Sequence, residues 1–527
     1  MFRFLIIAIF CFATVAHAAE NFEFLNKPGP YTVGLQVNQQ YDRSRVYKTR
    51  VSLVTGKPTD GERARPLQIL VWYPAQNGGK VVTFRDYLSF GVTEGNFMYT
   101  PDEVWRATDQ LLADRTYRMP GAVRVSNQRM WALKDAPKRK EKFPVVIYTP
   151  GANASAAENP DLCEYLASQG YIVIASPSQG ARTRGMTINM EGLETQVADI
   201  GYLMSFAGSL PQADIEKIAV VGYSWGGLAN VVAAAKDDRI KVLISLDGSV
   251  RYFPELVDGG KDAVRYVNAA QVAVPFLYVS RRLPGIEELN QNGNSTHFSL
   301  LNKMTYADML MVTMQPMTHP DFASSGLRLA PDSDFGEYTR TEVSTAYGWM
   351  AHYVHSFLDA YLKNDPKARD FIIENPINNG VPPHMITINM RRGSGVPPTR
   401  EAFVKQLAKQ GFDKAAAIYK EMKSAGANFT LDSNDINRWG YELLRNGIVT
   451  ESISIFRFGT QILPADANLF DSLGEALVKG GLREDAIQSY RRSLALDPTN
   501  TNAIERLKLL NATVKESESD PKTTNLQ

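Results

Sequence analysis

IAVVGYSWGGLANVVAAAKDD, residues 218–238, begins as an apolar β-type run, passes through Gly-x-Ser-x-Gly-Gly and continues as a helix-type segment. A chain that reverses from strand to helix this sharply holds its serine at the apex, with the hydroxyl clear of the sheet. Gly222 and Gly226 suit the turn because a Cβ at either flank would collide with neighbouring backbone. The motif therefore makes Ser224 a candidate nucleophile and the chain a candidate serine hydrolase.

A serine nucleophile needs a base to take its proton and an acid to orient that base. The next apolar strand, IKVLISLDGS, ends at Asp247, 23 positions after Ser224 (247 − 224). In folds of this kind the acid usually follows the strand after that, here VAVPFLYVS, but Arg281 and Arg282 stand there. We therefore assign the acid to Asp247. The alternative is an aspartate that caps a turn or a helix.

Two of the six histidines, His319 and His297, are candidates for the base. DMLMVTM (308–314) predicts a further strand, and QPMTHPDF places His319 on the short loop beyond it, where it can reach over the serine. His297 lies in STHFSLLNKMTY, which is typical of the opening turn of the preceding helix. We favour His319, and the order Ser–Asp–His along the chain is that of the α/β-hydrolases.

Attack on an ester carbonyl also needs backbone N–H groups that stabilise the developing oxyanion, each by about 3 kcal/mol. One donor is expected from the residue after the nucleophile, Trp225. The second is expected from PGANAS, the loop after the strand FPVVIYT, where Gly151 allows close approach. We assign this donor to Ala152, with Asn153 as the alternative. An ordinary strand-to-helix loop would show the same pattern.

GYSWGG, LDGS and the opening segment GPYTVGLQV…RPLQILVWYPA resemble the platelet-activating-factor acetylhydrolase and dienelactone-hydrolase branch of the α/β-hydrolases, over roughly residues 28–365. The resemblance implies an esterase that needs no metal or cofactor and acts on a small-molecule or lipid ester. Its triad would be Ser224, Asp247 and His319, with Ala152 and Trp225 as oxyanion donors.

The chain departs from that family at two points. Pro150 and Gly151 stand where the family usually has His-Gly, which bears on the oxyanion loop. The acid and the histidine are 72 positions apart (319 − 247), a long separation that keeps His297 as an alternative base. The elbow also resembles prolyl-oligopeptidase-type peptidases, although no propeller-length region precedes it.

The first residues, MFRFLIIAIFCFATVAHAAE, predict a secretory leader cleaved near Ala18 or Ala19. A retained anchor is the alternative, but the apolar run is shorter than the ~20 residues of a membrane span. Cleavage would leave Cys163 as the sole cysteine, so no internal disulfide could form. We expect a secreted protein without a transmembrane anchor, in a bacterial periplasm. With 57 Lys and Arg against 56 Asp and Glu, we expect no nucleic-acid partner.

The rest of the first part alternates strands and helices. Strands are expected at about 31–41 and 66–75, followed by the strand–helix units above and a long helix near 341–363. This alternation predicts an α/β-hydrolase fold, a mostly parallel sheet with helices on both faces. A long insertion at about 80–140 is interpreted either as a cap whose aromatics line a pocket or as a buttress beside the sheet. Its large side chains are Phe84, Tyr87, Phe90, Phe97, Met98, Tyr99 and Trp105.

Beyond RRGSGVPP (391–398) the pattern becomes helical and repeats every 34 residues. Leu473-Gly474, Ala486, Tyr490 and Pro498 match the tetratricopeptide spacing, and Trp439-Gly440, Ser452, Phe456 and Pro464 precede them by 34 positions. A third, degenerate unit is expected at about 400–430. Such repeats either bind a protein or peptide partner, or support the first domain and self-association.

These observations predict four segments: a signal peptide at 1–19, a hydrolase domain at 20–390 with a cap insertion at about 80–140, an all-α tetratricopeptide-repeat domain at 399–511, and a disordered tail at 512–527. The predicted activity is hydrolysis of carboxylic esters through an acyl-enzyme. Two alternatives stay open: a serine peptidase with the same triad, and a repeat-based binding protein whose hydrolase domain is a scaffold.

Overall fold

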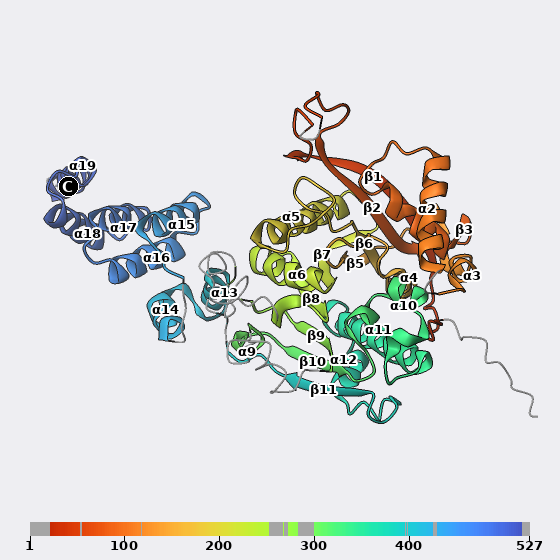
Figure 1. Cartoon of the computed structure of the whole chain (residues 1–527). Helices are drawn as coiled ribbons and strands as arrows, with labels where there is room; N and C mark the ends of the chain where they lie inside the picture. Colours follow the sequence, from red (N-terminus) through yellow and green to blue (C-terminus); the bar gives the residue numbers. More distant parts are fainter. Residues whose placement is uncertain are drawn as a thin grey trace, which may run out of the picture. The chain divides into compact units, whose positions relative to one another are not determined.

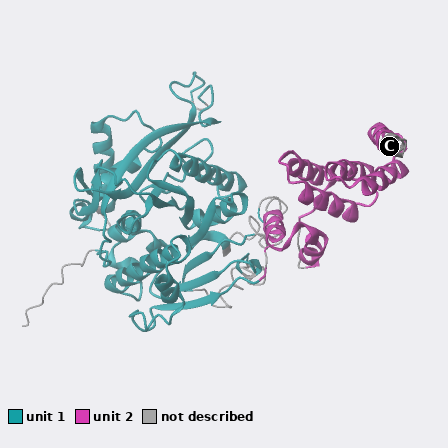
Figure 2. Ribbon diagram, turned by 180° about the vertical axis from the view of Figure 1, so that it is seen from behind, with its two compact units in different colours: residues 1–394 teal, residues 395–527 magenta. Residues whose placement is uncertain are grey.

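The structure is a computed structural model that describes residues 22–52, 55–116, 119–251, 267, 272–282, 300–395, 397, 399–424 and 429–518. The chain divides into two compact units, residues 1–394 and 395–527 (Figure 2). The division falls within the segment 391–398. Among the helices of the described ranges, none is long and apolar enough to cross a membrane.

The first unit is built on an 11-stranded sheet with the order β11-β10-β9-β8-β7-β5-β6-β2-β1-β4-β3 (Figure 1). Its strands are β1 Thr32–Val46, β2 Ala64–Ala75, β3 Lys80–Thr83, β4 Arg129–Lys134, β5 Phe143–Thr149, β6 Ile172–Ala175, β7 Ala213–Tyr223, β8 Ile240–Leu246, β9 Phe276–Arg281, β10 Met309–Met314 and β11 Ile386–Arg391.

The centre of this sheet is parallel. Strands β6, β5, β7, β8, β9 and β10 pair in parallel, while β2 runs antiparallel to β6 and β1, and β11 runs antiparallel to β10. The predicted mostly parallel sheet is confirmed. Because parallel strands end at one edge, the segments that follow β5, β7, β8 and β10 can converge there.

Helices cover both faces of the sheet (Figure 1). In β5, Val146 and Tyr148 join one core with α4 and α11, whereas Val145 and Ile147 join the other core with α5 and α6. Side chains of a strand alternate between faces, so each buried strand serves two cores. The α-helices among the described residues of this unit are α1 Phe84–Thr93, α2 Pro101–Thr116, α3 Ala122–Ser126, α4 Pro160–Ser168, α5 Met190–Ala207, α6 Trp225–Lys236, α9 Leu300–Lys303, α10 Ser324–Leu329, α11 Arg340–Leu362 and α12 Pro366–Ile373.

The insertion at 80–140 contributes strands as well as helices. β4 pairs with β1, and β3 pairs with β4, so the insertion extends the sheet at its edge. Phe84 and Tyr87 are 0% and 1% exposed in the core, whereas Met98 and Trp105 are 82% and 59% exposed. The strands of the insertion therefore belong to the edge of the sheet, where β4 continues the hydrogen bonding of β1.

The second unit is helical in the residues that the structure describes. Its helices are α13 Arg400–Gln410, α14 Ala415–Ser424, α15 Ser433–Arg445, α16 Val449–Ile462, α17 Ala467–Lys479, α18 Arg483–Leu496 and α19 Thr501–Glu518. Helices α15, α17 and α19 begin 34 residues apart (467 − 433 and 501 − 467), as do α16 and α18 (483 − 449). α19 continues into the range 512–527, so residues 512–518 are helical where disorder was predicted.

Small residues face aromatic ones within these helix pairs. A Cβ on Gly440 would lie 2.4 Å from the ring of Phe456, and one on Gly474 would lie 2.7 Å from the ring of Tyr490. The glycines therefore let each pair of helices approach closely enough for the aromatic ring to fill the contact.

Candidate functional site

Ser224 stands between β7 and α6 in a conformation that few residues adopt. Its φ is 52° and its ψ is −119°. Three backbone hydrogen bonds hold it there: its N–H donates to Leu246 (3.0 Å), and its carbonyl accepts from Gly227 (3.1 Å) and Ser249 (2.9 Å). Such strained positions cost about 1–3 kcal/mol and persist where the surrounding structure enforces them.

The two glycines of the motif are required because neither position has room for a Cβ. A Cβ on Gly222 would lie 2.5 Å from the side-chain nitrogen of Asn230. A Cβ on Gly226 would lie 2.0 Å from the carbonyl oxygen of Thr149 and 2.6 Å from that of Pro150. The first turn of α6 therefore packs directly on the end of β5, which brings the predicted oxyanion loop next to Ser224.

The structure brings the three predicted triad residues together. His319 begins a short 3₁₀ helix, His319–Phe322, after β10. Its Nε2 lies 3.0 Å from Ser224 Oγ, and its Nδ1 lies 2.5 Å from Asp247 Oδ2. A carboxylate can only accept a hydrogen bond, so Nδ1 carries the proton and Nε2 accepts from the serine hydroxyl. We call these three side chains the Ser–His–Asp array. His297 lies outside the described residues.

Asp247 is buried, at 1% exposure, and its φ is 43°. Its N–H donates to the carbonyl of Val279 (2.6 Å), which ties the end of β8 to β9. The Arg281 N–H donates to Asp247 Oδ1 (3.2 Å), and Arg281 Nε lies 3.6 Å from Oδ2. The end of β9 thus carries a partner of the acid in place of the acid itself. The sequence showed the arginine but not this contact.

Tyr223 supports the histidine from β7 and had not been singled out from the sequence. Its hydroxyl donates to the carbonyl of His319 (2.9 Å), and the two rings lie 5.0 Å apart at 30°. Burial raises the pKa of Tyr223, so the phenol stays protonated and able to donate. Tyr223 therefore holds both the backbone and the imidazole ring of His319.

The predicted oxyanion loop follows β5 and opens with a turn. The Ala154 N–H donates to the carbonyl of Gly151 (3.1 Å), and Asn153 has a φ of 63°, as the third residue of a type II turn requires. Asn153 Oδ1 accepts from the Met186 N–H (2.6 Å). In the described part of the chain the Ala152 N–H has no acceptor.

The other predicted donor, Trp225, is the first residue of α6 and is 2% exposed. Its backbone N–H lies at the positive end of the helix, where negative charge is favoured. Ala152 and Trp225 thus lie on two segments that meet where Gly226 contacts the end of β5.

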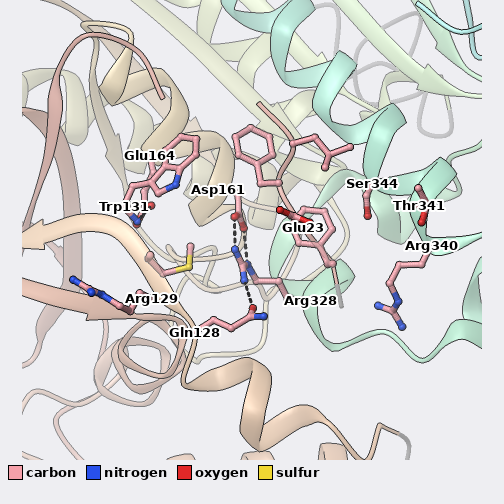
Figure 3. Close-up of a pocket in the computed structure, with 14 residues that line it drawn as sticks. Glu23, Gln128, Arg129, Trp131, Asp161, Glu164, Arg328, Arg340, Thr341 and Ser344 are labelled. Carbon is pink, nitrogen blue, oxygen red and sulfur yellow. Dashed lines mark hydrogen bonds and ion pairs between the residues drawn. The ribbon is translucent and has the colours of Figure 1, made fainter. Parts of the chain in front are cut away.

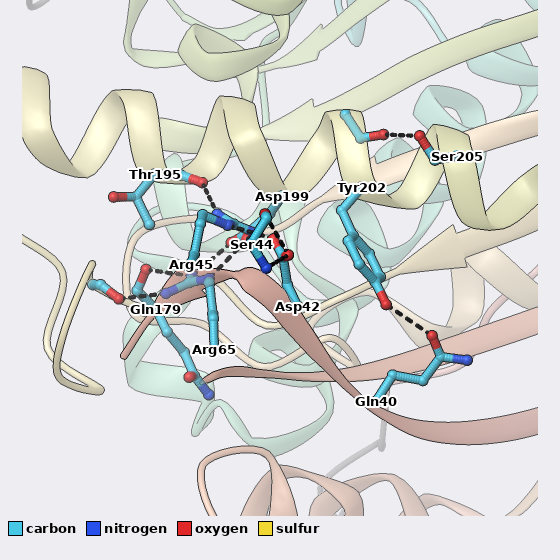
Figure 4. A network of polar contacts seen from close by, with 12 residues as sticks. Gln40, Asp42, Ser44, Arg45, Arg65, Gln179, Thr195, Asp199, Tyr202 and Ser205 are labelled. Atoms are coloured by element: carbon cyan, nitrogen blue, oxygen red, sulfur yellow. Dashed lines mark hydrogen bonds and ion pairs between the residues drawn. The ribbon is translucent and has the colours of Figure 1, made fainter. Parts of the chain in front are cut away.

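A buried network of charges holds the start of the loop after β6, at Gln179 (Figure 4). Arg65, 1% exposed, donates to both oxygens of Asp199 (2.8 and 2.6 Å) and to the carbonyls of Gln179 (3.0 Å) and Gly180 (2.6 Å). Arg45 adds a second ion pair to Asp199 (2.7 Å). The network joins β1, β2 and α5 to the loop after β6, and that loop in turn holds Asn153.

A cavity of about 820 Å³ lies beside α4, α10 and α11 (Figure 3). Arg328 crosses it and pairs with Asp161 (2.6 and 2.9 Å), while Glu164 and Ser344 also line it. No member of the Ser–His–Asp array is among its lining residues. The cavity is therefore separate from the array.

The sheet topology and the strained serine define an α/β-hydrolase-like unit. Residues 130–278, which include Ser224 and Asp247, match the dienelactone hydrolase family. A ferulic acid esterase from Streptomyces cinnamoneus is similar in structure, with 17% sequence identity and a TM-score of 0.48, over 70% of this chain and 99% of the esterase chain. No curated protein matches the sequence. The family match supports an esterase-type hydrolase domain in the first unit.

Proposed function

We propose that the chain hydrolyses carboxylic esters with Ser224 as nucleophile, His319 as base and Asp247 as the residue that orients the base. The observation that carries this proposal is the continuous hydrogen-bonded path from Ser224 Oγ through the imidazole to Asp247 Oδ2, at 3.0 and 2.5 Å. The match of residues 130–278 to a family of hydrolases supports the same class of reaction.

In the proposed reaction, Ser224 Oγ attacks the ester carbonyl carbon while its proton passes to His319 Nε2. The negative charge that forms on the carbonyl oxygen is stabilised by the N–H groups of Ala152 and Trp225. The intermediate then collapses, the C–O bond to the alcohol breaks, and the alcohol oxygen takes the proton from His319. A water molecule, deprotonated by the same imidazole, then attacks the acyl carbon; the C–O bond to Ser224 breaks, the acid is released, and Ser224 Oγ takes the proton back from His319. Asp247 stabilises the imidazolium in both halves.

The test uses a fluorophosphonate probe and a short-chain 4-nitrophenyl ester. Wild type should be labelled on the peptide that contains Ser224 and should hydrolyse the ester. Ser224→Ala should do neither, while keeping its circular dichroism spectrum. Ser344→Ala is the matched control, because Ser344 is a buried serine of the separate cavity, at 4% exposure. Absence of labelling and of turnover in folded wild type would overturn the proposal, and faster cleavage of amides than of esters would indicate a peptidase.

We also propose that residues 399–511 are tetratricopeptide repeats that bind a protein or peptide. The 34-residue spacing of the helix starts in α15, α17 and α19 supports this.

A further proposal is export to a bacterial periplasm after cleavage near Ala18 or Ala19, which rests on the leader sequence. N-terminal sequencing of the protein from a periplasmic fraction tests it, since an intact leader would contradict export.

A further inference from the structure

The loop that carries the predicted oxyanion donor is anchored at both ends by carboxyl groups. Glu158, just before α4, accepts the Gly151 N–H through Oε2 (2.9 Å). The same oxygen accepts the hydroxyl of Tyr148 (3.3 Å). Gly151 is the residue before Ala152, so this bond fixes the first peptide of the loop.

The second anchor comes from the insertion. Glu94, which caps the end of α1, is 1% exposed. Its Oε1 accepts the hydroxyl of Ser155 (2.7 Å) and the N–H of Ala156 (2.7 Å). A carboxyl group 57 residues before Gly151 (151 − 94) thus holds the far half of the loop.

These two anchors determine which backbone N–H groups of the loop are already engaged. The Gly151 N–H is occupied by Glu158 and cannot serve an oxyanion, whereas the Ala152 N–H has no acceptor in the described ranges. The Gly151 backbone also lies against the ring of Tyr223, since a Cβ there would be 3.2 Å from it. Releasing Glu158 would let the Gly151 peptide rotate and would displace the next N–H along the chain.

We propose that Glu158 and Glu94 are positioning residues that hold the Gly151–Glu158 loop so that the Ala152 N–H points at the developing oxyanion. The inference rests on the proposed role of Ser224, because without attack at an ester there is no oxyanion to stabilise. Neither glutamate touches the reacting atoms, and both act through the backbone of this loop.

The carboxyl groups of Glu158 and Glu94 are suited to this task in their protonated, neutral form. Burial raises the pKa of Glu158 to about 8 and that of Glu94 to about 7, although the hydrogen bonds from the loop lower both pKa values in part. A neutral carboxyl still accepts the N–H but places no negative charge beside the oxyanion. The titratable and charged groups around the two are Tyr148, Tyr223, Cys163 and Arg184, besides the glutamates themselves.

The variants are Glu158→Ala, Glu158→Gln and Glu94→Gln, with Glu164→Gln as the control. Glu164 is also a buried glutamate that accepts a tyrosine hydroxyl and a backbone N–H, but it lies by the separate cavity. Glu158→Ala should lower kcat by about 10-fold or more with KM within twofold, because only the transition state is affected. Glu158→Gln keeps an acceptor and should recover most of kcat, and Glu164→Gln should match wild type.

The pH profile separates positioning from general support of the fold. Wild-type kcat should fall above about pH 8, as Glu158 ionises and its charge opposes the oxyanion, whereas Glu158→Gln should keep its kcat. Equal kcat for Glu158→Ala and wild type, or a constant ratio of Glu158→Gln to wild type from pH 6 to about 10, would overturn the inference. A wild type that neither labels nor turns over would instead refute the proposed function, so the two failures are distinguishable.

Discussion

Gly226→Ala tests the packing that brings the two predicted oxyanion segments together. The added Cβ would lie 2.0 Å from the carbonyl oxygen of Thr149, whereas real Cβ contacts are essentially never under 3.0 Å. The first turn of α6 must therefore move by about 1.0 Å (3.0 − 2.0) from a backbone atom that cannot rotate away. A misplacement of about 1 Å at a reacting centre costs about 100-fold in rate, and overpacking of this kind costs about 1–3 kcal/mol of stability.

The assay compares kcat/KM for ester hydrolysis, the rate of phosphonate labelling and Tm in Gly226→Ala and Gly201→Ala. Gly201 lies within α5 and has no atom within 4 Å of an added Cβ. Gly201→Ala should keep its activity and gain about 0.5–1 kcal/mol of stability, because alanine favours a helix over glycine. If Gly226→Ala were as active and as stable as wild type, the close contact between α6 and β5 would not position the serine.

Three further outcomes are expected. Tyr223→Phe removes the hydrogen bond to the His319 carbonyl but keeps the ring, so kcat should fall about fivefold, the equivalent of about 1 kcal/mol; unchanged kcat would show that the ring alone suffices. Asp199→Asn leaves the buried Arg65 guanidinium without a carboxylate, while Arg45 keeps Asp42, and should cost about 3–5 kcal/mol in urea unfolding; a loss under 1 kcal/mol would contradict the role of the network. Burial lowers the pKa of His352 from its ordinary 6.5 to about 4, so its neutral form stabilises the fold above about pH 6.5 and that contribution is lost as pH falls toward 4. His352→Gln should therefore show a shallower loss of Tm over this range, and an identical slope would exclude the histidine as its source.

The central strand–helix pattern could be predicted from the sequence because its signal is local. The strand expected at residues 218–223 corresponds to the C-terminal part of β7, and the one expected at 308–314 corresponds to β10. The turns that follow these two strands put Ser224 and His319 at one edge of the sheet. Apolar runs bounded by glycine or charged residues identify buried parallel strands without knowledge of their neighbours.

Other strands gave no such signal. β6 has only four residues, β3 and β11 are the edge strands of the sheet, and β4 is next to the edge, where the apolar pattern is weak. The insertion was accordingly interpreted as a cap or a buttress, with no strand assigned to it. β4 pairs with β3 and with β1, and its partner in β1 lies 99 residues earlier in the chain (133 − 34), since Leu133 is opposite Gly34.

The same limit applies to the site. Ser224 and Asp247 could be assigned because a motif and a strand end mark them. Tyr223 and Arg281 could not, since each is defined by a contact with a distant segment at the sheet edge, and Glu158 could not, since its contact with Gly151 depends on how the loop after β5 folds. Their residue types are common, and only the fold shows which group each one holds.

The position of His319 after β10 has a consequence for synthesis of the chain. Ser224 and Asp247 follow the adjacent strands β7 and β8, but His319 follows the serine by 95 residues. Chains grow at about 5–20 residues per second, so the serine leaves the ribosome roughly 5–20 seconds before the histidine and the acid roughly 4–14 seconds before it. Its imidazole reaches the serine only once β10 has paired in parallel with β9. Under the proposed function, Ser224 of a nascent chain is inactive as a nucleophile until His319 is in place. Pairing of β10 with β9 therefore completes the active site.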